Sequence, residues 1–453
     1  MARRSRRQRL PVEPIALLID DLSHDGRGVG RHDGKVTFVH GALPGERVHA
    51  RLRNRNRRFD EALTLAVETP SAERVEPGCS WFGACGGCAM QHLDHSAQLN
   101  WKQSRLAENF KRIGQVLPAQ WLPPIHAKPW SYRRRARLSV RWVAGKGRVL
   151  VGFREIGGRF VADIERCDVL AEVFGDRLMS LSDMIGGLSI PDRIAQLECA
   201  AGDASAAIVL RHLDPLTDKD HQRLIDWSES NRINGQPIAI YLQPKGPDTV
   251  HRLTPAQHHL SYRLDEFNLD MAFKPQHFIQ INASVNQRLI HSAMRLMAAT
   301  RQEHILDLFC GLGNFSLPLA RSAGRVTGIE LDRALVEFAQ FNAERNGIAN
   351  AQFEVADLTQ DVAQLAFMKR AYDGVLIDPP RSGAAEILPL VAATQAARVV
   401  YVSCDPATLA RDAGQLVHEH GYTLVSAGIA DMFPHTAHVE SIALFTRSAE
   451  RQP

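Results

Sequence analysis

The sequence lacks the features of a membrane-spanning or secreted protein. Its 453 residues contain no run of about 18 consecutive apolar residues, the length needed to cross a bilayer. The first residues, Met1-Ala2-Arg3-Arg4-Ser5-Arg6-Arg7, include no apolar segment of the kind that a secretory signal requires. Beyond this arginine-rich start we find no low-complexity tract and no internal repeat. These absences predict a cytoplasmic globular protein.

A disulfide framework is also missing. The chain has seven cysteines, an odd number, and their clustering is not typical of paired cysteines in a cytosolic protein. Three of them lie close together as Cys79-x5-Cys85-x2-Cys88. We therefore expect the cysteines to serve metal binding or catalysis.

Charge is distributed unevenly along the chain. Residues 1–58 hold fourteen Lys and Arg against six Asp and Glu, a balance of +8, whereas the rest holds 40 basic against 44 acidic residues, a balance of −4. Because Lys and Arg bind phosphate backbones through counterion release, this basic part predicts an RNA-binding arm. A solvated charged terminus is the plainer alternative.

The order of predicted elements indicates three domains. Short segments broken by glycine turns over residues 14–67 predict a small β-barrel, and residues 96–113 have the apolar spacing of a helix. A mixed α/β region follows. From residue 303 predicted strands alternate with helices, which is typical of an α/β, doubly wound parallel sheet. The expected domains are 1–70, 71–275 and 276–453.

A glycine loop, Gly311-Leu312-Gly313-Asn314-Phe315-Ser316, follows the first of these strands. Ser316 stands where a dinucleotide fingerprint has its third glycine, so a pyrophosphate-binding role is weakened. S-adenosylmethionine has no phosphates, and it needs only close backbone approach and a carboxylate for its ribose. Glu330, at the end of the next strand, suits the ribose. Asp357, after the third strand, suits the adenine amino group, with a helix cap as the alternative.

Cys404 lies in the run Ser403-Cys404-Asp405-Pro406. Asp caps helices and Pro is favoured at the first helical position, so we expect Cys404 at the start of a helix, whose dipole would favour the thiolate. A thiolate beside a bound donor is a candidate nucleophile. A small buried cysteine at a strand end is the alternative.

Together these motifs resemble the RNA uracil-C5 methyltransferases, in particular the type that acts on 23S ribosomal RNA. The resemblance covers nearly the whole chain and rests on Phe278-Ile279-Gln280-Ile281-Asn282, the glycine loop, Asp378-Pro379-Pro380-Arg381, the Cys404 run and His438-Val439-Glu440-Ser441. It implies an S-adenosylmethionine-dependent methyltransferase domain with a TRAM-like barrel. A transfer-RNA member of the family lacks the barrel, so the architecture favours the ribosomal type.

The resemblance also assigns roles. Cys404 would add to uracil C6, and Glu440 would remove the C5 proton, being ionised at its ordinary pKa and made more basic by a drier site. Asp378 could orient the uracil edge instead of the donor. The residues that match the family's donor-binding set are Gln280, Phe309, Asn314, Glu330, Asp357 and Asp378.

The resemblance implies that Cys79, Cys85, Cys88 and Cys167 bind a [4Fe-4S] cluster. Four thiolates suit structural zinc equally well, so their chemistry leaves the metal open. A radical S-adenosylmethionine site is disfavoured, because its first two cysteines are three residues apart whereas here the gap is five. Cys199 and Cys310 are expected to be packing residues.

The expected partner is 23S ribosomal RNA, with no membrane or DNA partner, and the protein is expected to be a monomer. Aromatic rings beside Arg133, Arg134 and Arg135 suit RNA, although a plain strand with solvated arginines is the alternative. Two other functions remain open. The same chemistry could act on another ribosomal or transfer-RNA uracil, or the chain could be a non-catalytic RNA-binding or assembly protein.

Overall fold

The computed structural model describes residues 13–360 and 362–447, and the arginine-rich start lies outside these ranges. The chain forms two compact units. The smaller contains residues up to Trp101 together with Phe153–Ala162 and Pro434–His438, and the larger contains the rest. Within the described ranges, no helix is long and apolar enough to cross a membrane.

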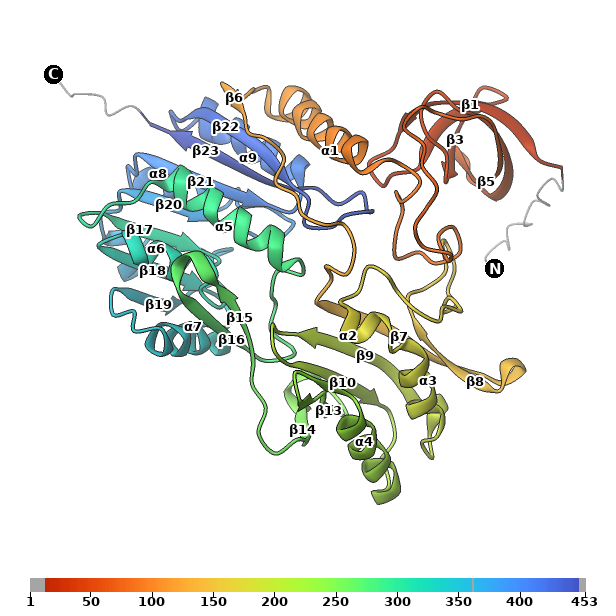
Figure 1. Cartoon of the computed structure of the whole chain (residues 1–453). Coiled ribbons are helices and arrows are strands. Elements are labelled where there is room, and N and C mark those ends of the chain that lie inside the picture. Colours follow the sequence, from red (N-terminus) through yellow and green to blue (C-terminus); the bar gives the residue numbers. More distant parts are fainter. Residues whose placement is uncertain (1–12, 361, 448–453) are drawn as a thin grey trace, which may run out of the picture. The chain divides into compact units, whose positions relative to one another are not determined.

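A closed five-stranded barrel forms most of the smaller unit (Figure 1). Residues alternate between interior and surface, so Val48, Ala50 and Leu52 are buried while Arg51 and Arg53 are exposed. The predicted barrel is confirmed, and these arginines of β4 lie on its outer face. The strand order is β1-β2-β3-β5-β4. Their bounds are β1 Ile15–Leu22, β2 Gly28–His32, β3 Lys35–His40, β4 Arg47–Arg55 and β5 Phe59–Thr69.

Helix α1 (His95–Asn109) and a further turn, η1 (Phe110–Gly114), match the helix predicted over 96–113. The predicted apolar face is correct, because Leu106 and Phe110 are fully buried. Lys102 lies on the same face and is also fully buried.

The larger unit has two large sheets and two short strand pairs. The first has the order β14-β13-β10-β9-β7-β8, with helices α2 (Glu172–Gly175), α3 (Leu178–Gly186) and α4 (Asp218–Ser230) between its strands in the sequence. Of the arginines for which a plain strand was the alternative, only Arg135 lies in a strand, as the first residue of β7. The strands are β7 Arg135–Val143, β8 Arg148–Gly152, β9 Ile194–Ala201, β10 Ala206–His212, β13 Ala239–Gln243 and β14 His251–Thr254, with a separate short pair, β11 Arg232–Ile233 and β12 Gln236–Pro237.

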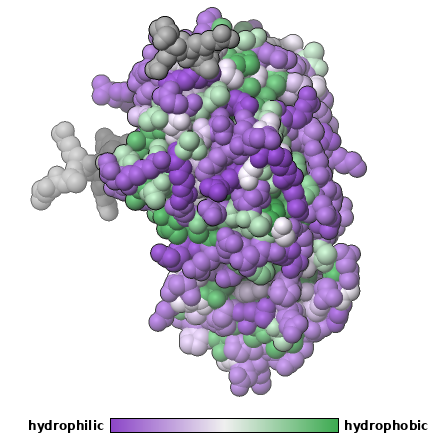
Figure 2. All heavy atoms as spheres, turned by 90° about the vertical axis from the view of Figure 1, so that its left-hand side faces the viewer, coloured by the Kyte–Doolittle hydropathy of each residue, from purple (hydrophilic) through white to green (hydrophobic). Residues whose placement is uncertain are grey.

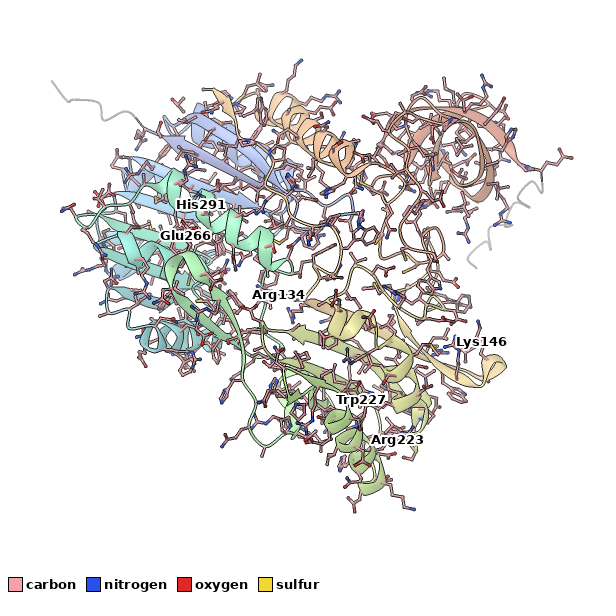
Figure 3. The ribbon with its side chains drawn as sticks, viewed as in Figure 1. Arg134, Lys146, Arg223, Trp227, Glu266 and His291 are labelled. Carbon is pink, nitrogen blue, oxygen red and sulfur yellow. The ribbon has the colours of Figure 1, made fainter. Side chains whose placement is uncertain are left out.

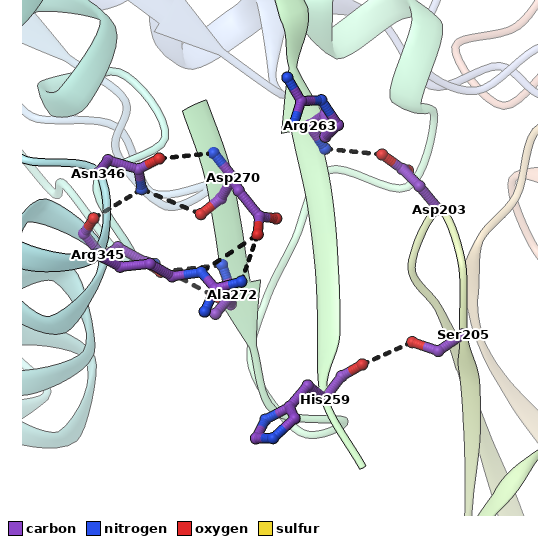
Figure 4. Close-up of polar contacts among 9 residues, drawn as sticks. Asp203, Ser205, His259, Arg263, Asp270, Ala272, Arg345 and Asn346 are labelled. Atoms are coloured by element: carbon purple, nitrogen blue, oxygen red, sulfur yellow. Dashed lines mark hydrogen bonds and ion pairs between the residues drawn. The ribbon is translucent and has the colours of Figure 1, made fainter. Parts of the chain in front are cut away.

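A hairpin of β15 (Leu260–Leu264) and β16 (Leu269–Phe273) is bonded to the loop between β9 and β10 and to the end of helix α7 (Arg333–Arg345) (Figure 4). On one side the backbone N–H of Arg263 donates to Asp203, at a distance of 2.7 Å. On the other side the N–H of Asp270 donates to Asn346 Oδ1 at 2.7 Å, and the Arg345 guanidinium pairs with the Asp270 carboxylate. The hairpin thus links the β9–β10 loop to helix α7 within this unit.

The second sheet has the order β19-β18-β17-β20-β21-β23-β22-β6. Its first five strands are parallel, as the alternation predicted. The predicted parallel arrangement does not extend to the last strands, because β23 runs antiparallel to both β21 and β22. The strands are β17 His304–Leu308, β18 Arg325–Glu330, β19 Ala351–Val355, β20 Gly374–Ile377, β21 Arg398–Ser403, β22 Thr423–Ala430, β23 Glu440–Thr446 and β6 Gln120–Trp121.

Helices separate the strands of this second sheet in the sequence. They are α5 Ala283–Met297, which precedes β17, α6 Ser316–Ser322, α7 Arg333–Arg345, α8 Leu388–Ala393 and α9 Pro406–His418. The strands bury nearly continuous apolar runs, such as Val399 to Val402, which is typical of a sheet covered on both faces. The face drawn in Figure 2 is mostly hydrophilic, with small separate hydrophobic patches.

A close backbone approach fastens η1 to α9. A Cβ atom at Gly114 would lie 2.3 Å from the carbonyl oxygen of Ala410, and this backbone oxygen cannot move aside cheaply. We expect Gly114→Ala to lower the free energy of unfolding by about 1–3 kcal/mol, as overpacking does. Thermal unfolding followed by circular dichroism measures this. Gly145→Ala is the matched control, because nothing lies within 4 Å of its Cβ position. Equal stability of the two variants would contradict the prediction.

Candidate active site

The predicted site residues gather at one edge of the second sheet. Asp378 follows β20, Cys404 follows β21, and Glu330 is the last residue of β18. Carboxyl ends of parallel strands meet at one edge, which is where ligands bind in such sheets. Glu440 is the first residue of β23, and because this strand is antiparallel, its start lies at the same edge.

The glycine loop at this edge is in an uncommon backbone conformation. Phe309 has φ of 64°, and Gly311 and Gly313 have φ of 53° and 87°. A bulky residue such as Phe is strained at positive φ, and such strain is concentrated at functional sites. The N–H of Gly311 donates to Glu330 Oε2 at 3.1 Å, which fixes the loop against the neighbouring strand.

Glu330 is held from two sides. Its Oε1 accepts hydrogen bonds from the backbone N–H groups of Leu331 and Asp332, at 2.8 and 3.1 Å. These bonds, with the one from Gly311, orient the carboxylate before any ligand binds. The side chain is only half-buried, and its oxygens retain further acceptor capacity.

Two residues that support Asn314 were not predicted from the sequence. Asn314 Oδ1 accepts from the Tyr262 hydroxyl at 2.9 Å and from Asn286 Nδ2 at 3.0 Å. Asn314 Nδ2 donates back to Asn286 Oδ1 at 3.0 Å. Asn286 sits among the buried positions of α5, so a polar residue in a helix's apolar stripe was the available signal. Tyr262 carried no such signal.

Arg134 is buried rather than displayed at the surface (Figure 3). Its Nε donates to the backbone oxygen of Gln280 at 2.9 Å, and its guanidinium lies 4.4 Å from the Tyr262 ring centre. Burial lowers the pKa of Arg134 and raises that of Tyr262 to about 12. Arg134 therefore supports the segment that carries Gln280. The RNA contacts expected of Arg133 and Arg135, which are half-buried, stay predictions.

Asp357 lies in an exposed turn after β19. Its Oδ1 accepts from the backbone N–H and the hydroxyl of Thr359, at 3.0 and 2.7 Å, and these bonds lower its pKa. The described residues that follow form a turn, so the helix-cap alternative is not observed. Its adenine-binding role stays a prediction.

Cys404 stands between β21 and α9, as predicted. Asp405 caps the helix by accepting from the N–H groups of Ala407 and Thr408, and Pro406 is the first helical residue. The expectation that this place favours the thiolate is wrong. Burial and the neighbouring Glu440 and Asp378 carboxyl groups raise the pKa of Cys404 to about 11.

Arg381 opposes these effects. Its charge and its hydrogen bond to the Cys404 side chain lower the pKa of the thiol. Its charge also lowers the pKa of Glu440. The sequence marked Arg381 only as part of a motif, and the structure brings it to the nucleophile.

Glu440 faces Cys404 across the β21–β23 pairing. Ser403 of β21 pairs with Ser441 of β23, so the next residues toward this edge are Cys404 after β21 and Glu440 at the start of β23. Burial raises the pKa of Glu440 to about 8, with a smaller contribution from the charge of Asp378. Burial also raises the pKa of Asp378 to about 7. The expectation that Glu440 is ionised at its ordinary pKa is therefore wrong, whereas the expectation that a drier site makes it more basic is confirmed. The site can hold and exchange protons near neutral pH.

Three of the four predicted metal ligands lie in one loop of the smaller unit. Cys79, Cys85 and Cys88 are half-buried, and the Gly87 N–H donates to Cys85 Sγ at 3.5 Å. Cys167 is buried in the larger unit. Over residues 13–360 and 362–447, no three His, Cys, Asp or Glu side chains are grouped to hold a single metal ion. Cys199 and Cys310, expected to be packing residues, are buried.

This fold and edge define an S-adenosylmethionine-dependent methyltransferase. A family model described as tRNA (Uracil-5-)-methyltransferase matches residues 248–448, and a TRAM domain model matches residues 8–61. The Pyrococcus abyssi tRNA (uracil-54, C5)-methyltransferase, solved with S-adenosyl-L-homocysteine, has the same fold. Its TM-score is 0.74 at 24% identity, over 95% of this chain and 99% of its own.

The particular family follows from sequence identity. The chain is 49% identical to a Xanthomonas campestris protein over 97% of this chain and 99% of the relative. It is 50% identical to an Alkalilimnicola ehrlichii protein over 98% and 99%. Both are named 23S rRNA (uracil(1939)-C(5))-methyltransferase RlmD. This chain belongs to the RlmD family.

One argument for the ribosomal type is overturned. We expected the architecture to favour the ribosomal type, yet the Pyrococcus protein, named as a tRNA enzyme, aligns over 99% of its length. Architecture therefore does not separate the two substrates, whereas identity of about half the residues with RlmD proteins does point to one of them.

The shift at Glu440 predicts a pH-dependent stability. Its folded pKa of about 8 exceeds the ordinary 4.5, so folding favours the protonated form. Stability is then lost as pH rises from about 4.5 to 8. We expect Glu440→Gln to escape this loss. Between pH 5 and pH 8.5 its free energy of unfolding should therefore increase relative to that of the parent by about 1–3 kcal/mol, which is measured as a relative rise in unfolding temperature. Glu419→Gln, at an exposed glutamate, is the control. A difference that does not change with pH would refute the shift.

Proposed function

We propose that this protein transfers a methyl group from S-adenosylmethionine to C5 of a uracil in 23S ribosomal RNA, the uracil at position 1939 that the names of its relatives give. The carrying observation is that Cys404 and Glu440 face each other across β21 and β23 at the edge that holds the glycine loop. A nucleophile and a base beside a donor-binding loop are what this reaction needs.

Cys404 begins the reaction. Uracil C5 is a poor nucleophile, but addition of the Cys404 sulfur to C6 moves the ring's electron pair to C5 and O4. C5 then attacks the donor's methyl group. Because the pKa of Cys404 is raised to about 11, its proton must be taken as the bond forms, and the ionised Asp378 carboxylate nearby is suited to take it, which leaves Glu440 free for the later step. Arg381 stabilises the resulting negative charge.

Glu440 completes the reaction. After methyl transfer its carboxylate removes the C5 proton, the electron pair restores the C5–C6 double bond, and the bond from C6 to the sulfur breaks with the thiolate leaving. A pKa of about 8 suits a base that works near neutral pH, because basicity and the ionised fraction are then both substantial.

S-adenosylmethionine supplies the electrophilic methyl group. We assign its binding to Gln280, Phe309, Asn314, Glu330, Asp357 and Asp378, with the ribose at Glu330 and the adenine amino group at Asp357. The fixed Glu330 carboxylate supports this assignment, since its orientation is already set by three backbone N–H groups. Asp378 lies close enough to Cys404 to affect its charge, so it can orient the uracil edge as well.

The target base must leave its stack to reach Cys404, which costs a few kcal/mol and is least costly in a loop or bulge. The exposed arginines of β4, Arg51, Arg53 and Arg55, are suited to hold the RNA backbone around it. Mapping of 5-methyluridine in ribosomal and transfer RNA from cells without this protein tests the substrate. Loss at a transfer-RNA site instead would favour the activity named for the Pyrococcus relative.

Cys79, Cys85, Cys88 and Cys167 are proposed to bind a [4Fe-4S] cluster, as the family resemblance implies. Thiolates are the ligands of such clusters, and the N–H donated to Cys85 Sγ favours a thiolate there. Each thiolate of a cluster binds a different iron, so its ligands need not converge on one point as they do around a single ion. With all four positions filled, the cluster would cross-link the chain and leave no open iron for substrate.

Removal of one ligand tests the metal site. We expect protein purified without oxygen to contain about four irons and four sulfides per chain, as [4Fe-4S] denotes. Cys88→Ser should lose most of this iron, whereas Cys199→Ala, at a buried cysteine outside the set, should keep it. Stoichiometric zinc without sulfide would instead assign a structural zinc site.

The two halves of the reaction can be separated by mutation. We expect Cys404→Ala to abolish methyl transfer while donor binding changes less than about twofold, because the sulfur acts on uracil alone. Glu440→Gln should stop the reaction after methyl transfer. Labelled methyl groups and ribosomal RNA lacking the modification, resolved on a denaturing gel, measure both outcomes.

The expected result for Glu440→Gln is a labelled protein–RNA band that the parent protein does not accumulate. Substantial turnover by Cys404→Ala would contradict covalent catalysis, and a missing band would assign the base elsewhere. Absence of label in uracil C5 with the parent protein would favour a non-catalytic RNA-binding role.

A further inference from the structure

The segment between β22 and β23, residues 431–439, leads directly into Glu440. Ala430, the last residue of β22, pairs with Glu440 itself. Asp431 is the next residue after that pair. Whatever holds residues 431–439 therefore acts on the position of the proposed base.

Lys102 of α1 binds the start of this segment. Its ammonium group lies 2.6 Å from Asp431 Oδ1 and 3.0 Å from the backbone oxygen of Phe433. The Lys102 and Asp431 side chains are both fully buried, and burial lowers the pKa of Lys102 while Asp431 opposes that effect. The pair and both of its hydrogen bonds belong to the larger unit.

Gln98, one helical turn earlier on α1, binds the middle of the segment. Its Oε1 accepts from the backbone N–H of His435 at 3.0 Å. Its Nε2 donates to the backbone oxygens of Met90 and Leu93, at 2.9 and 2.8 Å. The oxygen of His435 in turn accepts from the N–H groups of Ala89 and Met90. All of these bonds lie within the smaller unit.

Stability alone does not account for the buried pair. Taking two charges out of water costs several kcal/mol per ion, and replacing a buried ion pair by apolar residues is often neutral or stabilising. The pair fixes the path of the chain, because one ammonium group, on Lys102, binds both the carboxylate of Asp431 and the backbone oxygen of Phe433. Asp431, Phe433 and His435 are thus each held from α1.

We infer that Lys102 and Gln98 are positioning residues for Glu440. They hold the segment before β23 so that the Glu440 carboxylate stays beside Cys404 when the C5 proton is removed. This inference rests on the proposed function of Glu440 as the base. Neither residue takes part in donor binding or in the addition of the sulfur to C6, so loosening the segment slows only proton removal and release of the thiolate.

The test removes the charges of the pair together. Lys102→Met combined with Asp431→Leu leaves no unpaired buried charge but loses the bond to Phe433. A displacement of about 1 Å can cost roughly 100-fold in rate, so we expect the methylated protein–RNA adduct to break down about 10- to 100-fold more slowly. Donor affinity and the rate of adduct formation should stay within about twofold of the parent.

Single-turnover reactions with labelled donor and unmodified ribosomal RNA, quenched in denaturant at intervals, give both rates for each variant. Lys111→Met, an exposed lysine in η1, is the matched control and should behave as the parent. Thermal unfolding establishes that each variant is folded. Gln98→Leu serves as a second variant if the double variant does not fold, with slower adduct breakdown expected again.

A folded variant that breaks the adduct down at the parent rate would overturn the inference, and so would one that slows formation and breakdown equally. Glu440→Gln in the same series separates this from failure of the proposed function. If Glu440→Gln accumulates no adduct, the base is another group. If Glu440→Gln accumulates the adduct but the Lys102 and Gln98 variants break it down at the parent rate, only the positioning role fails.

Discussion

The pairing of β21 with β23 is the constraint on which the active site depends. Parallel strands bring Asp378, Cys404 and the glycine loop to one edge, but they cannot bring a residue from the start of a strand there. Because β23 is antiparallel, its first residue, Glu440, reaches that edge opposite Cys404. A shift of one residue in this register would turn Glu440 to the other face of the sheet and remove the base.

Burial at this edge acts on all three ionisable groups in the same direction. It raises the pKa of Asp378 to about 7, of Glu440 to about 8 and of Cys404 to about 11. The thiol thus needs a partner to take its proton, and the carboxyl groups are poised to accept and return one. Arg381 moderates the negative charge. The site is better described as a proton-exchanging cluster than as a preformed thiolate beside an ionised carboxylate.

Much of this arrangement could be predicted from the sequence. The alternation of strands and helices predicted the parallel core, and Asp405-Pro406 predicted the start of α9. The strand β22 has no clear strand pattern in the sequence, because Ser426 and Gly428 interrupt its apolar run. The direction of β23 could not be predicted without β22, because only the nine residues between these two strands show that there is no room for a crossover helix.

Burial of charge was harder to predict. Lys102 lies three residues after Leu99 and four before Leu106, on the apolar face of α1, and that position was the one sign of its role. Its partner Asp431 is 329 residues away in the chain, so no local pattern joins them. The raised pKa values likewise depend on tertiary packing.

The bond between Cys404 and uracil C6 is the central claim, and a 5-fluorouracil in place of the target base tests it most directly. Fluorine at C5 cannot be removed as a proton, so Glu440 cannot release the adduct. The account predicts a stable protein–RNA complex formed only with donor present, and mass spectrometry of its peptides should find one methylated fluorouracil nucleotide on Cys404. A complex joined through another residue, or methylated fluorouracil RNA released without any complex, would contradict it.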